Sequence, residues 1–174
     1  NTFTISNEGT IRERGGPRRN RKAENRPITL LHANMFKNNF HFPATICVSN
    51  VANQSTIVKF GSKKTNPNVK VVGIDENYLK VTGLNISEGR NLSKAEIDNG
   101  SDAMLIGKDV VKNIFEPRDT VVGKLVSIGN KKYKVAGILA SKGTSQVFTD
   151  NQVLIPLQNA RFSFPDNTPS YTVT

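Results

Sequence analysis

The hydrophobic pattern predicts a strand at each end of the first fifty residues, alternating at the start and largely apolar at the end. Residues 1–6 place Phe3 and Ile5 on one face of an extended segment. The run at 44–52 is apolar almost throughout, as in a strand that is largely buried. We therefore expect a strand at each end of this part of the chain.

Between these two strands the apolar period changes to that of a helix. After Pro27, apolar side chains recur at helical spacing at Ile28, Leu31, Met35 and Phe36. Thr29 can cap this helix with its side-chain oxygen, although no Glu or Gln three residues later completes a capping box. Residues 1–52 thus predict a strand, a helix and a strand, which is a βαβ or split βαβ unit.

Beyond residue 53 the pattern becomes one of short strands separated by turn residues. Residues 124–139 contain two alternating runs around Gly129 and Asn130, which predicts a β-hairpin. Strands are predicted at 55–60, 68–74, 124–129, 131–140 and 151–157. We expect residues 53–165 to form a β-rich subdomain.

Two short helices interrupt these strands. The first follows Ser93, an N-cap residue, and Glu96 completes the capping box. The second spans about 108–115 and can turn Val110, Val111 and Ile114 toward a core, and Pro117 ends it.

The charge of the chain is concentrated in one segment. The 174 residues carry a net charge of +10, and half of it lies in residues 12–26. The basic residues there are Arg12, Arg14, Arg18, Arg19, Arg21, Lys22 and Arg26. The simplest interpretation is a solvated, mobile loop over 8–26. The alternatives are contact with a polyanion or with an anionic lipid surface.

The sequence offers little catalytic chemistry. The two histidines, His32 and His41, and the single cysteine, Cys47, show no metal-ligand spacing, so no metal or cofactor is expected. Cys47 lies in an apolar run, where a thiol is usually inert. Residues 137–145 have the wrong spacing for a phosphate loop. We expect no catalytic residue.

The acidic residues and the glycine of 75–97 are better explained by structural roles in turns and helix caps than by catalysis. Asp75 follows a buried strand and is expected to cap the next helix. Gly89 supplies a turn, and Arg90 is expected to tie that turn to a carboxylate or carbonyl. With Ser93 and Glu96, these residues form a predicted set of turns and caps.

Several of these local signals occur together in a known family. In order along the chain they are "VVGIDENYL" (71–79), "GLNISEGRNLSKAE" (83–96), "LIGKDVVKNIF" (105–115), "VGKLVSIGNKKYKVAGIL" (122–139) and "VLIPLQNA" (153–160). They closely resemble the periplasmic core domain of MacB-type ABC transporter permeases, a domain also found in LolC/LolE-like and FtsX-like permeases. The resemblance is strong over 69–160 and weaker over 28–49.

The resemblance implies an α+β fold with two lobes. A split βαβ "porter" lobe carries an inserted β-rich "sabre" lobe. Residues 1–52 would be the first porter repeat, 53–165 the sabre, and 166–174 the start of a second porter repeat that is truncated here. The resemblance does not account for the basic segment.

The resemblance also implies a non-catalytic role in transport or efflux at the inner membrane, with this domain on the periplasmic side. Implied partners are a second permease subunit, in a homodimer or heterodimer, and a cytoplasmic ABC ATPase; a periplasmic adaptor and an outer-membrane channel are further candidates. The alternative is a free-standing basic β-rich protein that binds nucleic acid or another polyanion. The basic segment lacks interleaved aromatic residues, so specific nucleic-acid recognition is not expected.

Overall fold

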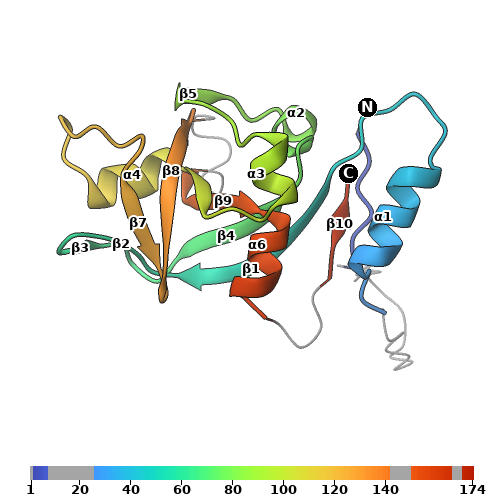
Figure 1. The fold of residues 1–174 in the computed structure, drawn as a ribbon, viewed down its shortest axis with the longest axis horizontal. Helices are drawn as coiled ribbons and strands as arrows, with labels where there is room; N and C mark the ends of the chain where they lie inside the picture. Colours follow the sequence, from blue (N-terminus) through green and yellow to red (C-terminus); the bar gives the residue numbers. More distant parts are fainter. Residues whose placement is uncertain (1, 8–25, 142–149, 166–169) are drawn as a thin grey trace, which may run out of the picture.

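A computed structural model describes residues 2–7, 26–141, 150–165 and 170–174, and shows a curled sheet covered by short helices (Figure 1). The helices are α1 (Leu30–Asn39), α2 (Tyr78–Thr82), α3 (Lys94–Asp98), α4 (Lys108–Ile114) and α6 (Leu157–Ser163). The strands are β1 (Val48–Thr56), β2 (Val58–Phe60), β3 (Lys63–Lys64), β4 (Val69–Ile74), β5 (Ile86–Gly89), β6 (Ala103–Ile106), β7 (Leu125–Ile128), β8 (Lys131–Leu139), β9 (Gln152–Pro156) and β10 (Thr172–Val173).

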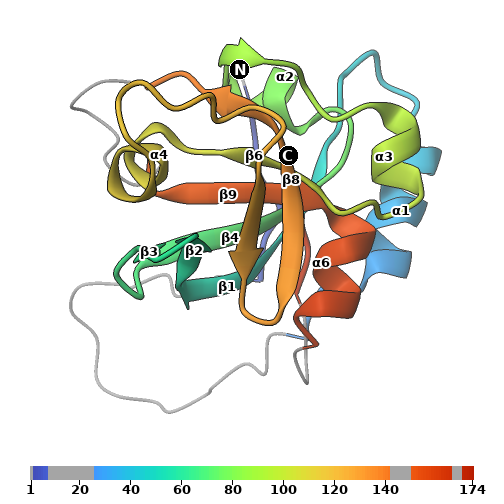
Figure 2. The ribbon, with the colours of Figure 1, turned by 60° about the vertical axis from the view of Figure 1, so that its left-hand side comes forward.

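The strands form one continuous sheet in the order β10-β1-β4-β9-β6-β8-β7-β2-β3, and β5 pairs with β8. The pairs β4–β9 and β6–β8 are parallel and the other pairs are antiparallel. Figure 2 shows β9 crossing the middle of the sheet between β4 and β6. This mixed sheet with helices confirms the α+β class.

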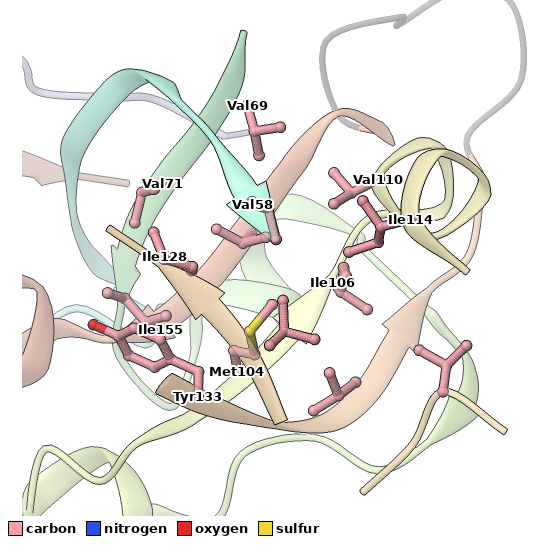
Figure 3. Close-up of a cluster of buried hydrophobic side chains, with 14 of the residues drawn as sticks. Val58, Val69, Val71, Met104, Ile106, Val110, Ile114, Ile128, Tyr133 and Ile155 are labelled. Carbon is pink, nitrogen blue, oxygen red and sulfur yellow. The ribbon is translucent and has the colours of Figure 1, made fainter. Parts of the chain in front are cut away.

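Both faces of the central strands are buried, because side chains alternate between two hydrophobic clusters. On β6, Met104 and Ile106 point into one cluster, and Ala103 and Leu105 into the other. The first cluster contains α4, the β7–β8 hairpin and the fully buried ring of Tyr133 (Figure 3). The second lies under α2 and α3. Such two-sided burial explains why these strands read as nearly continuous apolar runs.

A third, smaller cluster lies under α1. Its buried members are Ala33, Val48, Leu157, Tyr171 and Val173. We call residues 2–7, 26–50 and 170–174 the α1 lobe, and the other described residues the main body. β1 joins the two, since it pairs with β10 on one side and β4 on the other (Figure 1).

The helix predicted after Pro27 is confirmed as α1. The side-chain oxygen of Thr29 accepts a hydrogen bond from the backbone N–H of His32 at 3.2 Å. The predicted apolar stripe is only partly right, because Leu31 and Met35 are 66% and 51% exposed. The helix buries Ala33 instead.

The two strands predicted in this region need correction. Within the strand predicted at 1–6, the described residues 2–6 form no regular strand, and Ile5 makes an isolated bridge to Val173. The second strand begins at Val48 and continues to Thr56, several residues later than the predicted 44–52. The predicted boundary between residues 52 and 53 therefore falls inside β1, and the division into porter and sabre lobes stays a prediction.

Most elements of the main body are confirmed. β7 and β8 form the predicted antiparallel hairpin, with Gly129 at a φ of +59° in its turn. The capping box of α3 forms as predicted from Ser93 and Glu96. In α4, Val110 and Ile114 are buried, while Val111 is half-buried against the same cluster.

Candidate functional site: the junction between the α1 lobe and the main body

Lys37 on α1 connects the α1 lobe to the main body. Its Nζ lies 2.7 Å from Oδ2 of Asp75 and 3.0 Å from Oε1 of Glu76. Both carboxylates follow β4 directly, so the end of that strand receives the helix. Among the described residues, the ion pairs across this junction are those of Lys37.

Asp75 is the best-buried charge at this junction. The same Oδ2 accepts a hydrogen bond from the backbone N–H of Val48 at 2.8 Å, which fixes the start of β1. Burial raises the pKa of Asp75, and the hydrogen bond from Lys37 opposes that rise. Burial also works against the charge on Lys37, but the two carboxylates outweigh it and raise the pKa of Lys37. The geometry favours a fixed, ionised pair.

Asn77 adds a second connection across the junction. Its side-chain amide donates to the carbonyl oxygen of Ile46 at 2.8 Å. Asn77 is also the N-cap residue of α2, so the prediction that Asp75 caps this helix is wrong. Asp75 instead accepts from the backbone N–H of Asn77 at 3.1 Å, which closes a local turn. The Asp75 carboxylate also accepts a hydrogen bond from Lys37 at the lobe junction. The two residues lie 38 positions apart in the sequence, so local patterns do not reveal this contact.

The other predicted turn residues form a separate corner of the main body. Gly89 ends β5 with a φ of +80°, and the guanidinium of Arg90 donates two hydrogen bonds to the carboxylate of Glu96, both at 2.7 Å. These bonds lower the pKa of Glu96 to about 2, and the capping N–H of Ser93 contributes. The structure thus brings together four of the five predicted turn and cap residues, while Asp75 lies at the lobe junction.

A further polar centre was missed in the sequence. Asn159 on α6 is 1% exposed, and its Oδ1 accepts from the hydroxyl of Tyr133 at 3.0 Å. Its Nδ2 donates to the carbonyl oxygens of Gly100 and Ser101 and to the carboxylate of Asp102. The residue lies in the "VLIPLQNA" motif, but only the folded chain shows that this amide connects α6 to two segments.

The histidine and cysteine side chains of the chain, its candidate soft metal ligands, do not form a metal-binding cluster in the described residues. Cys47 is fully buried next to β1, and burial raises the pKa of its thiol to about 11. His32 and His41 are both exposed. In the described ranges no cluster of three or more His, Cys, Asp or Glu side chains could hold a metal ion.

Most of the basic segment lies outside the described residues. Arg12, Arg14, Arg18, Arg19, Arg21 and Lys22 belong to it, so their predicted contact with an anionic surface stays a prediction. Arg26 is described and is exposed just before α1. Lys142 and Gly143, from the segment with the wrong phosphate-loop spacing, also lie outside the described residues.

Comparison with known proteins decides which family this architecture represents. The family model of the MacB-like periplasmic core domain matches residues 1–174. The chain belongs to the MacB-like periplasmic core domain family. It is similar to the pyoverdine export ATP-binding/permease protein PvdT of Pseudomonas fluorescens, at 30% identity over 104 residues. It is also similar to the macrolide export ATP-binding/permease protein MacB of Bartonella henselae, at 24% identity over 121 residues.

These alignments cover 58% and 69% of the MacB-like chain but only 16% and 18% of the two export proteins. The chain therefore corresponds to a small part of each relative. Among the described residues, no helix is both long and apolar enough to cross a bilayer.

Solved structures share the fold of this MacB-like domain. The extracellular domain of the ABC-type transporter YknZ from Gram-positive bacteria aligns with a TM-score of 0.70 at 21% identity, covering 84% of this chain and 72% of that one. The periplasmic region of MacB from Actinobacillus actinomycetemcomitans aligns with a TM-score of 0.70 at 18% identity, covering 85% and 64%.

Proposed function

We propose that this chain is the extracytoplasmic domain of an ABC transporter permease, and that it transmits ATP-driven motion to an exported substrate without catalysing a reaction itself. The observation that carries the proposal is the match of the family model along the whole chain. The relatives named as ATP-binding/permease export proteins support an ABC ATPase as the partner that supplies the motion.

The structure supports a mechanical role in two ways. One sheet runs from β10 in the α1 lobe to β3 at the far end of the main body, so displacement of one end can be carried through backbone hydrogen bonds. Lys37 and Asp75 fix the helix of the lobe to that sheet. Neither feature needs an activated nucleophile. The raised pKa of the Cys47 thiol makes Cys47 a poor nucleophile.

The substrate and the other partners belong to the same proposal. Export of an organic molecule is proposed by analogy with the two relatives, one a pyoverdine export protein and the other a macrolide export protein. A permease dimer, a periplasmic adaptor and an outer-membrane channel would complete the pathway. On this account the domain faces the periplasmic side of the inner membrane, or the cell exterior where there is no outer membrane.

The parent gene gives the first test of this proposal. One apolar helix of about 20 residues should precede Asn1 and three should follow Thr174. In the reconstituted transporter, removal of residues 1–174 should leave measurable ATP hydrolysis and abolish export. Polar flanking sequences, or undiminished export after the deletion, would contradict the proposal.

A further inference from the structure

Three lysines and one serine form a row across four strands, at the end of the sheet opposite β10 (Figure 1). Lys64 on β3 lies opposite Lys59 on β2, which in turn lies opposite Ser127 on β7. Ser127 lies opposite Lys132 on β8. Directly opposite residues of antiparallel strands share a face of the sheet, so we call these four residues the lysine row. With neighbouring strands about 4.8 Å apart, the row spans about 14 Å.

The lysine row lies on an open part of the sheet. Its three lysines are exposed, whereas the alternate residues of the same strands, such as Val58 and Tyr133, are buried in the first hydrophobic cluster. Farther along the same face of β8, Ala136 belongs to the second cluster under α2 and α3. Those helices cover that part of the face, and in the part of the chain that the structure describes the row itself stays open to solvent.

The lysine row also lacks carboxylate partners. Lys63 and Lys131 lie on the same strands but on the opposite face, and they form ion pairs with Glu116 and Asp102. Among the described residues, the ion pairs include no lysine of the row. The two lysines that β2 and β3 place directly opposite each other repel. A partner with negative charge would relieve that repulsion, so the row favours an anionic partner.

Apolar groups border the row on β7 and β8. Lys134 lies on the same face as the row, opposite Leu125, which is 59% exposed. Lys134 also lines a hollow of about 430 Å³, together with Ala136. Among the described residues that line it, Glu96 is the carboxylate, and the guanidinium of Arg90 already binds it. The surface thus combines free positive charge with an exposed aliphatic side chain and a hollow beside it.

We propose that the lysine row docks an acidic segment of another protein, with carboxylates on the lysines and an aliphatic side chain of the segment between Leu125 and the hollow. Carboxylates spaced along a polypeptide can reach lysines spread over about 14 Å, which a single small anion cannot. A second copy of this chain is disfavoured, because each copy carries a net charge of +10. The inference depends on this face alone and holds whichever substrate the parent protein exports.

The same face fits other polyanions less well. The aromatic side chains of its strands, Phe60 and Tyr133, belong to the opposite face, where Phe60 packs on Phe115. Bases of a single-stranded nucleic acid would therefore find no ring of these strands on which to stack. A lipid interface usually receives several large apolar side chains, and Leu125 is the exposed one on these strands.

Binding of an acidic peptide tests the proposal, and the probe is a fluorescent peptide of eight glutamates around a central leucine. It should bind the 174-residue chain, and added salt should weaken the binding. Lys59→Glu with Lys132→Glu should lower the affinity at least about tenfold, because two attractions become repulsions. The matched control, Lys80→Glu with Lys108→Glu, makes the same change in net charge at exposed lysines on α2 and α4, and should lower it less than about threefold.

The apolar contact has its own test. Leu125→Ser should weaken binding of the leucine-containing peptide and leave binding of an all-glutamate peptide unchanged. Residues 12–26 are the same in every variant, so binding by that basic segment cancels in each comparison. Circular dichroism should show that all variants remain folded, since each replaced side chain is exposed.

Three results would overturn the inference. One is an equal loss of affinity in the two double variants, because binding would then follow net charge alone. Another is the absence of peptide binding even at low salt. The third is binding of oligothymidine or of phosphatidylglycerol vesicles that depends on Lys59 and Lys132 while binding of the peptide does not.

Discussion

At the scale of single residues, the charges that matter most are those with fixed partners. Glu96 accepts two hydrogen bonds from Arg90 and one from the backbone N–H of Ser93, so one side chain serves both an ion pair and a helix cap. Asp75 combines Lys37 with the backbone N–H of Val48 in the same way. Each carboxylate thereby adds a charged connection between segments that also meet through apolar packing and other hydrogen bonds.

The Glu96 site predicts a dependence of stability on pH. The pKa of Glu96 is lowered from 4.5 to about 2 in the folded chain, so its ionised form stabilises the fold above about pH 4.5. That contribution is lost as the pH falls through about 2. Glu96→Gln should therefore lower the free energy of unfolding by about 1 kcal/mol near neutral pH, a modest value because Arg90 is largely exposed.

Urea unfolding of the wild type and Glu96→Gln at several pH values measures this effect. The difference between them should shrink between pH 4.5 and 2. Asp109→Asn removes an exposed ion pair with Lys112 on α4 and should have a much smaller effect near neutral pH. A constant difference between the wild type and Glu96→Gln at every pH would contradict the assignment.

At the scale of elements, close backbone approach decides where glycine is needed. β5 packs against β8 with Gly89 opposite Gly137. A Cβ at Gly89 would meet the carbonyl oxygen of Ala136 and lie 2.8 Å from the Cα of Gly137. Gly89 also has a φ of +80°, a conformation that side chains disfavour.

Gly89→Ala should consequently destabilise the chain by at least about 2 kcal/mol, through both the clash and the backbone conformation. Gly129→Ala provides the control: its φ is +59°, yet a Cβ there would meet nothing within 4 Å. It should cost only about 1 kcal/mol. Equal losses in urea unfolding would show that the approach of β5 to β8 is not as tight as described.

How far the sequence predicts these elements depends on whether the signals are local. The capping box at Ser93, the Thr29 cap and the hairpin around Gly129 were all predicted, because each depends on neighbouring residues. The strand expected at residues 1–6 is not formed by its described residues, 2–6, where Ile5 alone makes a backbone bridge, to Val173 near the opposite end of the chain.

The candidate site shows the same limit. Lys37 had no local feature to distinguish it from other basic residues, and its role appears only when α1 meets the end of β4. Asn159 lay within a motif of the family resemblance, but its six partners come from the folded chain. The family resemblance could be seen in the sequence because it depends on the order of many local motifs, and the match of the family model confirms it.

At the scale of the whole molecule, we propose that the chain is a stiff connection between the α1 lobe and the main body. The long sheet supplies the stiffness, and β1 carries it across the junction. Lys37 then sets how firmly α1 follows that sheet. Loss of this lysine leaves Asp75 buried without its cation, which should loosen the junction.

The most direct test of this account measures ATP hydrolysis and export together in the reconstituted parent transporter. With Lys37→Met, ATP hydrolysis should persist while the amount exported per ATP falls severalfold. Lys37→Arg keeps the positive charge and should retain much of the export per ATP. The control Lys112→Met, which removes an exposed ion pair on α4, should behave as the wild type. Equal amounts of folded transporter must be compared. Unchanged export per ATP in folded Lys37→Met would contradict transmission of motion through this junction.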